Sequence, residues 1–321
     1  MSIADPSAMN RRRLMTSLAA TGALGAATLA GSEAKGATGV TESGSVAWTQ
    51  AHNNNHVLEL QAAGAGPSTG EVTVEYWGHC AIKITSPKGF SMIFDPWRND
   101  PSGYWGIWFP NDFSKPVVDA GFSTHAHFDH DAINLVQATM LLDRVPGVFQ
   151  FTDVTVTGVA DKHACEAPGW YPWTNAIKEF GGDPCPPNNP GHMDMVTYVV
   201  ETGGIRILIW GDNRHNPPDD VWQRWGRIDV LTLPVDGSQH ILSYDQANGI
   251  VARLKPKVVI PTHYLCEGTS LTLSTLQPAD EWVNAQKSKK KLDGATLKLN
   301  AADVAKMNGE FLYFGNNVMK T

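Results

Sequence analysis

The residues best suited to chemistry are crowded into positions 123–131, which read Ser-Thr-His-Ala-His-Phe-Asp-His-Asp. His125 and His127 are two positions apart, so in extended backbone their side chains point to the same side and can reach one metal ion. Asp129 and His130 follow where the chain bends toward a predicted helix, and they are placed to face a second ion. Imidazole and carboxylate ligands suit zinc, and also iron or manganese. The spacing predicts a metal centre, rather than a polar loop that happens to be rich in histidine.

Further candidate ligands stand at the ends of predicted strands. His163 follows an alternating apolar stretch and would supply a third nitrogen to the first ion. Asp212 and His263 each end an apolar strand farther along the chain. His240 precedes a predicted helix, and it either faces the substrate or begins that helix without a chemical role. Ligands that recur at strand ends indicate a layered α/β sheet with its site along one edge.

The elements that position these residues follow from hydrophobic periodicity. Runs in which apolar and polar residues alternate predict strands, and segments rich in glycine, proline and asparagine predict the turns between them. We expect strands at residues 72–76, 81–85, 91–94, 117–123, 152–159, 195–201, 205–209, 228–233, 257–260 and 295–299. We expect helices at residues 132–142, 245–254 and 278–291, the last with a solvated lysine run at its end.

Two features flank the expected site. Asp95 directly follows a predicted strand, and it either accepts the free ring N–H of a metal-bound histidine or caps the turn before Pro96. Residues 97–113 form a predicted loop that contains six aromatic side chains. A loop this apolar must pack against another part of the protein. We expect it to form a wall of the substrate pocket, with a buried flap as the alternative.

The N-terminal segment has the features of a targeting signal. Three arginines at 11–13 precede the uncharged, apolar run 14–30, which is short and weakly apolar for a membrane span. Paired arginines before such a run are typical of a twin-arginine signal, and an uncleaved tail is the alternative. We therefore predict a signal peptide at 1–34, a flexible lead-in at 35–70 and one catalytic domain at 71–321. Export by the twin-arginine machinery would place the protein in the periplasm or outside the cell.

Composition narrows the class of partner. The formal charge of −7 over 321 residues argues against a nucleic-acid partner, which would require a basic face. The four cysteines form no Cys-x-x-Cys pair, which argues against a thiolate zinc site. In an exported protein, Cys165 and Cys185 either form a disulfide or remain free thiols. Eleven tryptophans supply a core or line a pocket for an apolar substrate.

The candidate ligands, in their types and order, resemble the metallo-β-lactamase superfamily and its His-x-His-x-Asp-His motif. The resemblance extends over residues 71–264. Within the superfamily the chain is similar to the branch that holds ascorbate-6-phosphate lactonase and the phospholipase D that acts on N-acylphosphatidylethanolamine. The shared features are Trp77-Gly78-His79, Phe94-Asp95-Pro96-Trp97, Trp210-Gly211-Asp212 and Pro261-Thr262-His263-Tyr264. The resemblance implies an αββα four-layer sandwich, in which two sheets pack face to face with helices outside.

The resemblance also implies a role for each candidate residue. It implies seven ligands for two divalent ions: His125, His127 and His163 for the first, Asp129, His130 and His263 for the second, and Asp212 as the bridge between them. The ions would be zinc, with manganese or iron as alternatives. Asp212 stands where the drug-hydrolysing lactamases often have cysteine, which argues against antibiotic hydrolysis. Only about fifty residues separate Asp212 from His263, too few for the domain inserted there in the nucleic-acid-processing branch.

These residues predict a binuclear hydrolase. Two divalent ions that share one water lower its pKa and turn it into a hydroxide nucleophile. That hydroxide would cleave an ester, lactone or phosphodiester bond in a small, partly apolar substrate. Asp129 would orient the hydroxide or pass a proton, and His240 would protonate the leaving group. The alternatives are an iron-dependent redox enzyme of the same fold and a non-catalytic metal-binding protein of the periplasm.

Overall fold

The computed structural model describes residues 37–40, 46–48, 68–103, 105–164, 193–271 and 276–319. The predicted signal at 1–34, and Cys165 and Cys185, therefore lie outside the described residues. In the lead-in, β1 (Ala37–Val40) and β2 (Val46–Trp48) pair antiparallel. No helix among the described residues is long and apolar enough to cross a membrane.

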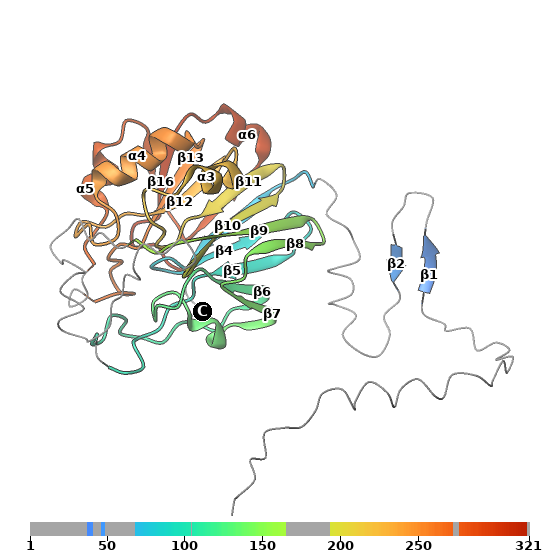
Figure 1. The fold of residues 1–321 in the computed structure, drawn as a ribbon, viewed down its shortest axis with the longest axis horizontal. Coiled ribbons are helices and arrows are strands. Elements are labelled where there is room, and N and C mark those ends of the chain that lie inside the picture. The colour runs from blue at the N-terminus through green and yellow to red at the C-terminus, as the bar shows by residue number, and fades with distance from the viewer. Residues whose placement is uncertain are drawn as a thin grey trace, which may run out of the picture.

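Two β-sheets form the body of the protein (Figure 1). The smaller sheet has six strands in the order β15-β3-β4-β5-β6-β7. Its strands are β3 (Val72–Tyr76), β4 (Ile82–Thr85), β5 (Ser91–Phe94), β6 (Val117–Ser123), β7 (Gln137–Asp143) and β15 (Thr296–Leu299). β3, β4 and β5 are antiparallel neighbours, whereas β5, β6 and β7 run parallel.

The larger sheet has eight strands in the order β14-β16-β13-β12-β11-β10-β9-β8. Its strands are β8 (Gly147–Phe151), β9 (Val154–Asp161), β10 (Met195–Thr202), β11 (Ile205–Ile209), β12 (Val230–Pro234), β13 (Val258–Thr262), β14 (Lys289–Lys291) and β16 (Glu310–Tyr313). β10 and β11 form the predicted hairpin around Gly203 and Gly204. β11, β12, β13 and β16 are parallel, so β11, β12 and β13 end at the same edge of the sheet.

Apolar side chains from the facing sides of both sheets build the main core. Along β3 the residues alternate between buried and half-buried, as the sequence pattern predicts. Phe94 of β5 stacks on Phe122 of β6 with ring centroids 4.7 Å apart, and it meets Tyr198 of the other sheet at 5.7 Å. Phe90 stacks on Phe151 across the same interface at 4.7 Å. These aromatic contacts fix the separation of the two sheets beneath the site.

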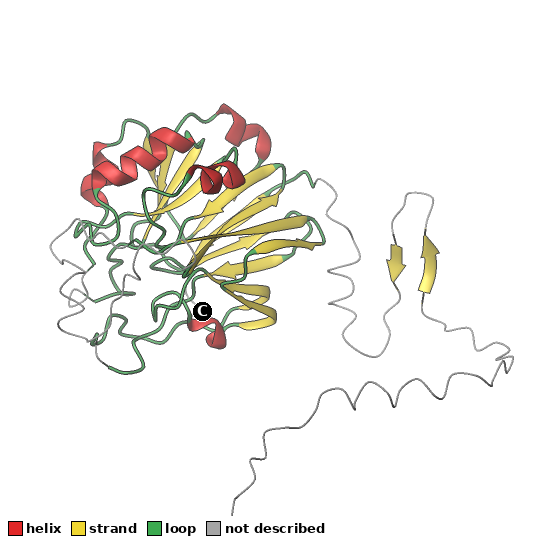
Figure 2. Cartoon of the chain, in the orientation of Figure 1, coloured by secondary structure: helices red, strands yellow, loops and turns green. Residues whose placement is uncertain are grey.

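The outer faces of the sheets are covered differently (Figure 2). The helices α3 (Asp219–Trp225), α4 (Tyr244–Leu254), α5 (Asp280–Ala285) and α6 (Ala301–Lys306) bury apolar side chains in the same core cluster as the eight-stranded sheet. On the six-stranded sheet, Ile93 and Val118 pack instead against the aromatic loop, through Trp97, Phe109 and Phe113. The predicted mixed α/β fold with two packed sheets is confirmed.

Two of the expected helices are wrong. In the segment 132–142, only Ala132–Leu135 is helical, as a 3-10 turn, and the chain then forms β7 beside β6. The apolar spacing there suits either structure, and pairing with the open edge of β6 decides for the strand. In the segment 278–291, the helix α5 ends at Ala285, and the lysine run forms the edge strand β14. The three lysines of β14 are exposed, in agreement with the predicted solvated face.

Candidate metal centre

The candidate ligands converge at one end of the two sheets, where several strands finish. The histidine motif follows β6, and His163 follows β9. Asp212 follows β11, and His263 directly follows β13. Because β11 and β13 lie in one parallel array, the same edge of the sheet presents both side chains. The expectation that ligands gather at strand ends is therefore met for all seven predicted ligands.

Asp212 lies at the centre of this group. Its Oδ2 atom is 3.2 Å from Nε2 of His263 and 3.4 Å from Nε2 of His130. The same oxygen is 3.6 Å from Nε2 of His163 and 3.9 Å from Nε2 of His125. Ligand atoms bound at about 2.1 Å to one tetrahedral ion are about 3.4 Å apart. The carboxylate is thus spaced as a ligand shared between two groups of histidines.

The first group consists of His125, His127, His163 and Asp212, whose ligand atoms lie within 4.8 Å of one another. Burial, followed by the charge of neighbouring histidines, lowers the pKa of His125 well below its usual range. Burial and the charge of His163 lower the pKa of His127 to about 3. Both rings are therefore neutral at physiological pH, and the neutral imidazole is the form that binds a metal.

The second group gathers around Asp129. Its Oδ2 atom lies 3.5 Å from Nε2 of His263 and 3.6 Å from Nε2 of His130. It also accepts a hydrogen bond from Nε2 of His79 at 2.9 Å. Cys80 lies beside the same histidines, but burial raises the pKa of its thiol, so it is protonated and a poor ligand. His79 is a supporting residue that the predicted ligand set did not include.

The histidines of the second group carry extra protons in the metal-free site, and a bound cation would replace those protons. Burial alone would lower the pKa of His263, but the carboxylates of Asp212 and Asp129 outweigh burial and raise it to about 10. The same carboxylates raise the pKa of His130 against the effect of burial. Burial opposes ionisation of Asp129 and Asp212, and the neighbouring histidines nonetheless lower both pKa values. Without a metal, the carboxylates hold protons on these rings, and a divalent ion would displace them.

The buried polar atoms also fit a bound metal. Within the described residues, Nε2 of His125, His130 and His263 and Oδ1 of Asp212 are buried and make no hydrogen bond. Buried polar atoms normally have partners, so several that converge on one point need an explanation. Imidazole nitrogens and a carboxylate are the ligands of zinc, iron and manganese sites. The residues present therefore fit the two divalent ions that the sequence predicts.

The opposite ring nitrogens are held by neighbouring groups. Nδ1 of His125 lies 3.0 Å from Oγ1 of Thr124, and Nδ1 of His130 lies 3.0 Å from Oδ2 of Asp95. Asp95 is fully buried, and it also accepts hydrogen bonds from the backbone N–H and the hydroxyl of Thr124 at 2.7 and 2.9 Å. Of the two roles open to Asp95 from sequence, the structure places it on the ring N–H of a candidate ligand.

The backbone is strained at several of these positions. His79, Asp95 and His263 have φ values of 53°, 51° and 62°, in the left-handed region that side chains with a Cβ rarely adopt. Gly211, with φ of 57°, precedes Asp212, and a Cβ there would lie 2.6 Å from Oγ1 of Thr124. Strain of this kind persists where the surroundings enforce it, and it concentrates at functional sites.

His240, the predicted proton donor, lies at the edge of the second group. Its ring centroid is 4.9 Å from that of His263. Its Nδ1 atom is 3.0 Å from Oδ2 of Asp236 and 3.1 Å from Oγ of Ser238. Asp236 in turn accepts the backbone N–H of Ser238 at 2.7 Å. Sequence reasoning did not include Asp236 in the site, although it follows β12 as Asp212 follows β11, and this position was the available signal.

The described residues of the aromatic loop 97–113 form the buried flap that was the alternative expectation, and none of them lines the cavity beside the first group of ligands. Trp97 and Phe113 are buried on the outer face of the six-stranded sheet. Phe109 meets the ring of His79 edge to face at 5.6 Å, and Trp108 meets His240 at 6.5 Å. The loop therefore covers a sheet and also supplies apolar contacts to the rings behind the site.

Comparison with known proteins places this site in a family. Residues 73–263, more than half of the chain, match the family model described as a beta-lactamase superfamily domain. The chain belongs to this family. All seven candidate ligands of this chain lie within the matched residues.

Individual relatives carry consistent descriptions. The chain is 28% identical over 235 residues to a protein of Myxococcus xanthus named UPF0173 metal-dependent hydrolase, covering 64% of this chain and 77% of the relative. It is 26% identical to a protein of the same name from Polaromonas, covering 64% and 81%. Among solved structures, a candidate Zn-dependent hydrolase of the metallo-β-lactamase superfamily from Thermotoga maritima has a TM-score of 0.52 and 20% identity, covering 75% of this chain and 97% of that one. That structure supports the fold, and the family and relatives support a metal-dependent hydrolase.

Proposed function

We propose that this protein is a binuclear metal-dependent hydrolase that cleaves an ester, lactone or phosphodiester bond in a small, partly apolar substrate. The observation that carries the proposal is the position of Asp212, whose Oδ2 atom lies within 3.9 Å of the Nε2 atoms of four histidines. A single carboxylate oxygen shared in this way is the arrangement expected between two ions. Zinc is the proposed metal, and manganese or iron would be bound by the same types of ligand.

When bound, two divalent ions would supply the nucleophile by lowering the pKa of a shared water, and would polarise the oxygen under attack. His125, His127 and His163 would hold one ion, and Asp129, His130 and His263 the other, with Asp212 between them. Asp95 and Thr124 orient two of these rings through the opposite ring nitrogens. The chain's contribution is therefore to hold the ligands in place and to supply proton donors and acceptors around them.

Two residues are proposed to act on protons. Asp129 accepts a hydrogen bond from His79 through Oδ2, which fixes its carboxylate beside His263 and His130. Held in this way, Asp129 would orient the attacking water and accept its proton. His240 is held by Asp236 through Nδ1, and in this position beside His263 it would donate a proton to the leaving group.

The kind of bond and the cellular location are also proposals. The motifs around Trp77, Asp95, Trp210 and Pro261 support a place near the branch with ascorbate-6-phosphate lactonase and the N-acylphosphatidylethanolamine-hydrolysing phospholipase D, so lactones and phosphodiesters head the substrate screen. The arginines at 11–13 and the apolar run 14–30 support twin-arginine export to the periplasm. Mass spectrometry of the N-terminus after cell fractionation tests the export, and a full-length chain in the cytoplasm would contradict it.

Elemental analysis of protein purified without added metal tests the central proposal. We expect close to two zinc or manganese ions per chain, and hydrolysis of at least one lactone, ester or phosphodiester in the screen. Asp212→Ala should remove the shared ligand, reducing both the metal content and the activity. Two ions and full activity in that variant would refute the assignment of Asp212, and bound iron with oxygen or thiol turnover would favour the redox enzyme.

A further inference from the structure

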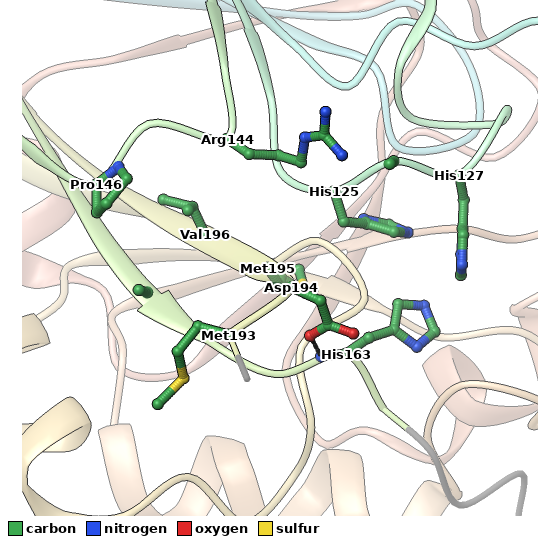
Figure 3. Close-up of a pocket in the computed structure, with 11 residues that line it drawn as sticks. His125, His127, Arg144, Pro146, His163, Met193, Asp194, Met195 and Val196 are labelled. Carbon is green, nitrogen blue, oxygen red and sulfur yellow. Dashed lines mark hydrogen bonds between the residues drawn. The ribbon is translucent and has the colours of Figure 1, made fainter. Parts of the chain in front are cut away.

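A cavity of about 400 Å³ opens beside the first group of ligands (Figure 3). His125, His127 and His163 line one part of it, and the remaining wall comes from side chains with no place in the metal centre. Arg144 and Pro146 belong to the connection between β7 and β8. In Figure 3, Met193 and Asp194 lie across the cavity from Arg144. A substrate bound at the metals would extend into this space.

The backbone of Arg144 is anchored to the start of the histidine motif. It lies where the chain crosses from the six-stranded sheet to the eight-stranded sheet, and its φ of 54° is left-handed. Its backbone N–H donates to the carbonyl of Ser123, which begins the motif, at 3.1 Å. The hydroxyl of Tyr198 accepts from the N–H of Val145 and donates to the same carbonyl, both within 3.2 Å. The left-handed backbone is thus anchored to the motif through Ser123, and it fixes the point from which the Arg144 side chain extends beside the cavity.

The guanidinium retains hydrogen-bonding capacity toward the cavity. Nε and Nη2 donate to the carboxylate of Asp143 at 2.7 and 2.6 Å, and these are its only side-chain hydrogen bonds within the described residues. Both side chains are about two-fifths exposed, so water screens the pair and holds it weakly. An arginine has five N–H groups in a planar fork, which matches a carboxylate or phosphate. An anion in the cavity would therefore gain contacts that the pair with Asp143 does not use.

We infer that this cavity is the substrate-binding pocket and that Arg144 binds an oxyanionic group, a carboxylate or phosphate, at the end of the substrate remote from the cleaved bond. The inference rests on the proposed function, since it takes the cleaved bond to lie at the metals. The rest of the cavity wall favours a substrate with a short apolar segment between the cleaved bond and the oxyanionic group. Met193 is 47% exposed, and Pro146 and Met195 add apolar surface beside it. Asp194 is engaged as an acceptor from the backbone N–H of His163 at 3.0 Å.

Binding of simple acids to the zinc-loaded protein tests this inference without requiring turnover. Monocarboxylates and dicarboxylates of matched chain length, from three to six carbons, are titrated calorimetrically. One carboxylate is common to both series and can bind at the metals, so the ratio of their affinities reports the second anionic group. We expect one chain length at which the dicarboxylate binds at least about tenfold more tightly. Phosphonocarboxylates of the same length show whether carboxylate or phosphate is preferred.

Variants of Arg144 locate the effect. Arg144→Asn suits the left-handed backbone and removes the charge, so it should reduce the tenfold ratio to about one while monocarboxylates still bind. Arg144→Lys keeps the charge without the fork and should give an intermediate ratio. Arg224→Gln is the matched control, because Arg224 is exposed and paired with Asp220 on α3, and it should retain the full ratio.

The outcomes separate this inference from the proposed function. A ratio near one at every chain length in the wild type, or a ratio that survives in Arg144→Asn, would overturn the role of Arg144. Metal content is measured in every variant. If Arg144→Asn loses zinc, the affinity ratio of Arg144→Lys is compared with that of the wild type at equal zinc content, and an unchanged ratio would overturn the role of Arg144. If the protein prefers dicarboxylates through Arg144 but hydrolyses none of the substrates, the proposed hydrolase function is contradicted and the anion site at Arg144 is still supported.

Discussion

Asp95→Asn is the substitution that most directly tests how the protein builds its metal centre. Oδ2 of Asp95 lies 3.0 Å from Nδ1 of His130, and the two side chains are fully buried. In the wild type the carboxylate can only accept, so Nδ1 carries the proton and Nε2 is left to bind a metal. An asparagine that places its NH₂ group toward His130 would donate to Nδ1 instead. The proton would then move to Nε2, the tautomer that cannot bind the ion.

The size of the effect follows mainly from the contact with His130, and the NH₂ group also ceases to accept the hydroxyl of Thr124. Oδ1 of Asp95 accepts the backbone N–H of Thr124 at 2.7 Å, and the asparagine carbonyl can retain that bond. Loss of a supporting hydrogen bond to a metal-binding histidine typically costs about 10–100-fold in metal affinity, or about 1.4–2.7 kcal/mol. We expect this loss at the second ion, and a smaller one at the first, because His125 is held by Thr124 rather than by Asp95 directly.

Competition with a coloured zinc chelator measures the two affinities separately. We expect one site with a zinc affinity close to that of the wild type and one with an affinity reduced about 10–100-fold. The rate of hydrolysis should fall in proportion to the fraction of protein whose second site is empty. Asp153→Asn is the matched control, since Asp153 is a buried acid that accepts from Ser86 and Lys88 far from the ligands. It should reduce stability without changing either affinity. Two wild-type affinities in Asp95→Asn would refute the orienting role of Asp95.

Three other consequences of the structure can be measured. Asp236→Asn should lower kcat about 100-fold or more at equal metal content, because the ring of His240 loses its charged partner; an unchanged kcat would count against proton donation by His240. Since the pKa of His263 is raised to about 10 in the metal-free site, metal binding below that pH should release at least one proton, and the affinity should rise about tenfold per pH unit up to about pH 10. Calorimetry in buffers of different ionisation enthalpy detects the proton, and a buffer-independent enthalpy would contradict its presence. Gly211→Ala should cost about 2 kcal/mol or more in chemical denaturation, because φ is 57° and the new Cβ would meet Thr124; wild-type stability would show that the turn before Asp212 relaxes.

Local spacing predicted much of the site because its first half is local. His125, His127, Asp129 and His130 fall within six positions, so the strand–loop geometry brings their side chains together wherever that strand lies. The later ligands were predictable for a different reason. Asp212 and His263 stand at strand ends, and strands that run parallel in one sheet bring those ends to the same edge. Neither inference needed the details of packing.

Of the two site residues that sequence reasoning left out, Asp236 had a signal in its position after a strand, whereas His79 depends on packing. His79 reaches Asp129 only because the turn after β3 is folded against β13, where the backbone carbonyl of His79 accepts the N–H of His263 at 3.0 Å. That contact spans the two sheets, and no local pattern encodes it. The strand β7 was mistaken for a helix for the same reason, since its apolar spacing fits both structures and only the free edge of β6 decides.

The left-handed backbone at Asp95 links this architecture to the test proposed above. Asp95 must leave β5 and turn at once so that its carboxylate can reach both Thr124 and His130, and a φ of 51° achieves this turn. Asparagine tolerates left-handed backbone better than most residues, so Asp95→Asn replaces a hydrogen-bond acceptor by a donor and removes the charge while keeping the turn. Asp95→Ala would remove the hydrogen bonds and also strain the turn, so its effect on metal binding could not be separated from backbone strain. We expect Asp95→Asn and Asp95→Ala to weaken binding of the second ion to the same extent, and Asp95→Asn to unfold at the higher denaturant concentration. In that case the loss of metal affinity is caused by the lost hydrogen bond to His130 and not by strain in the turn.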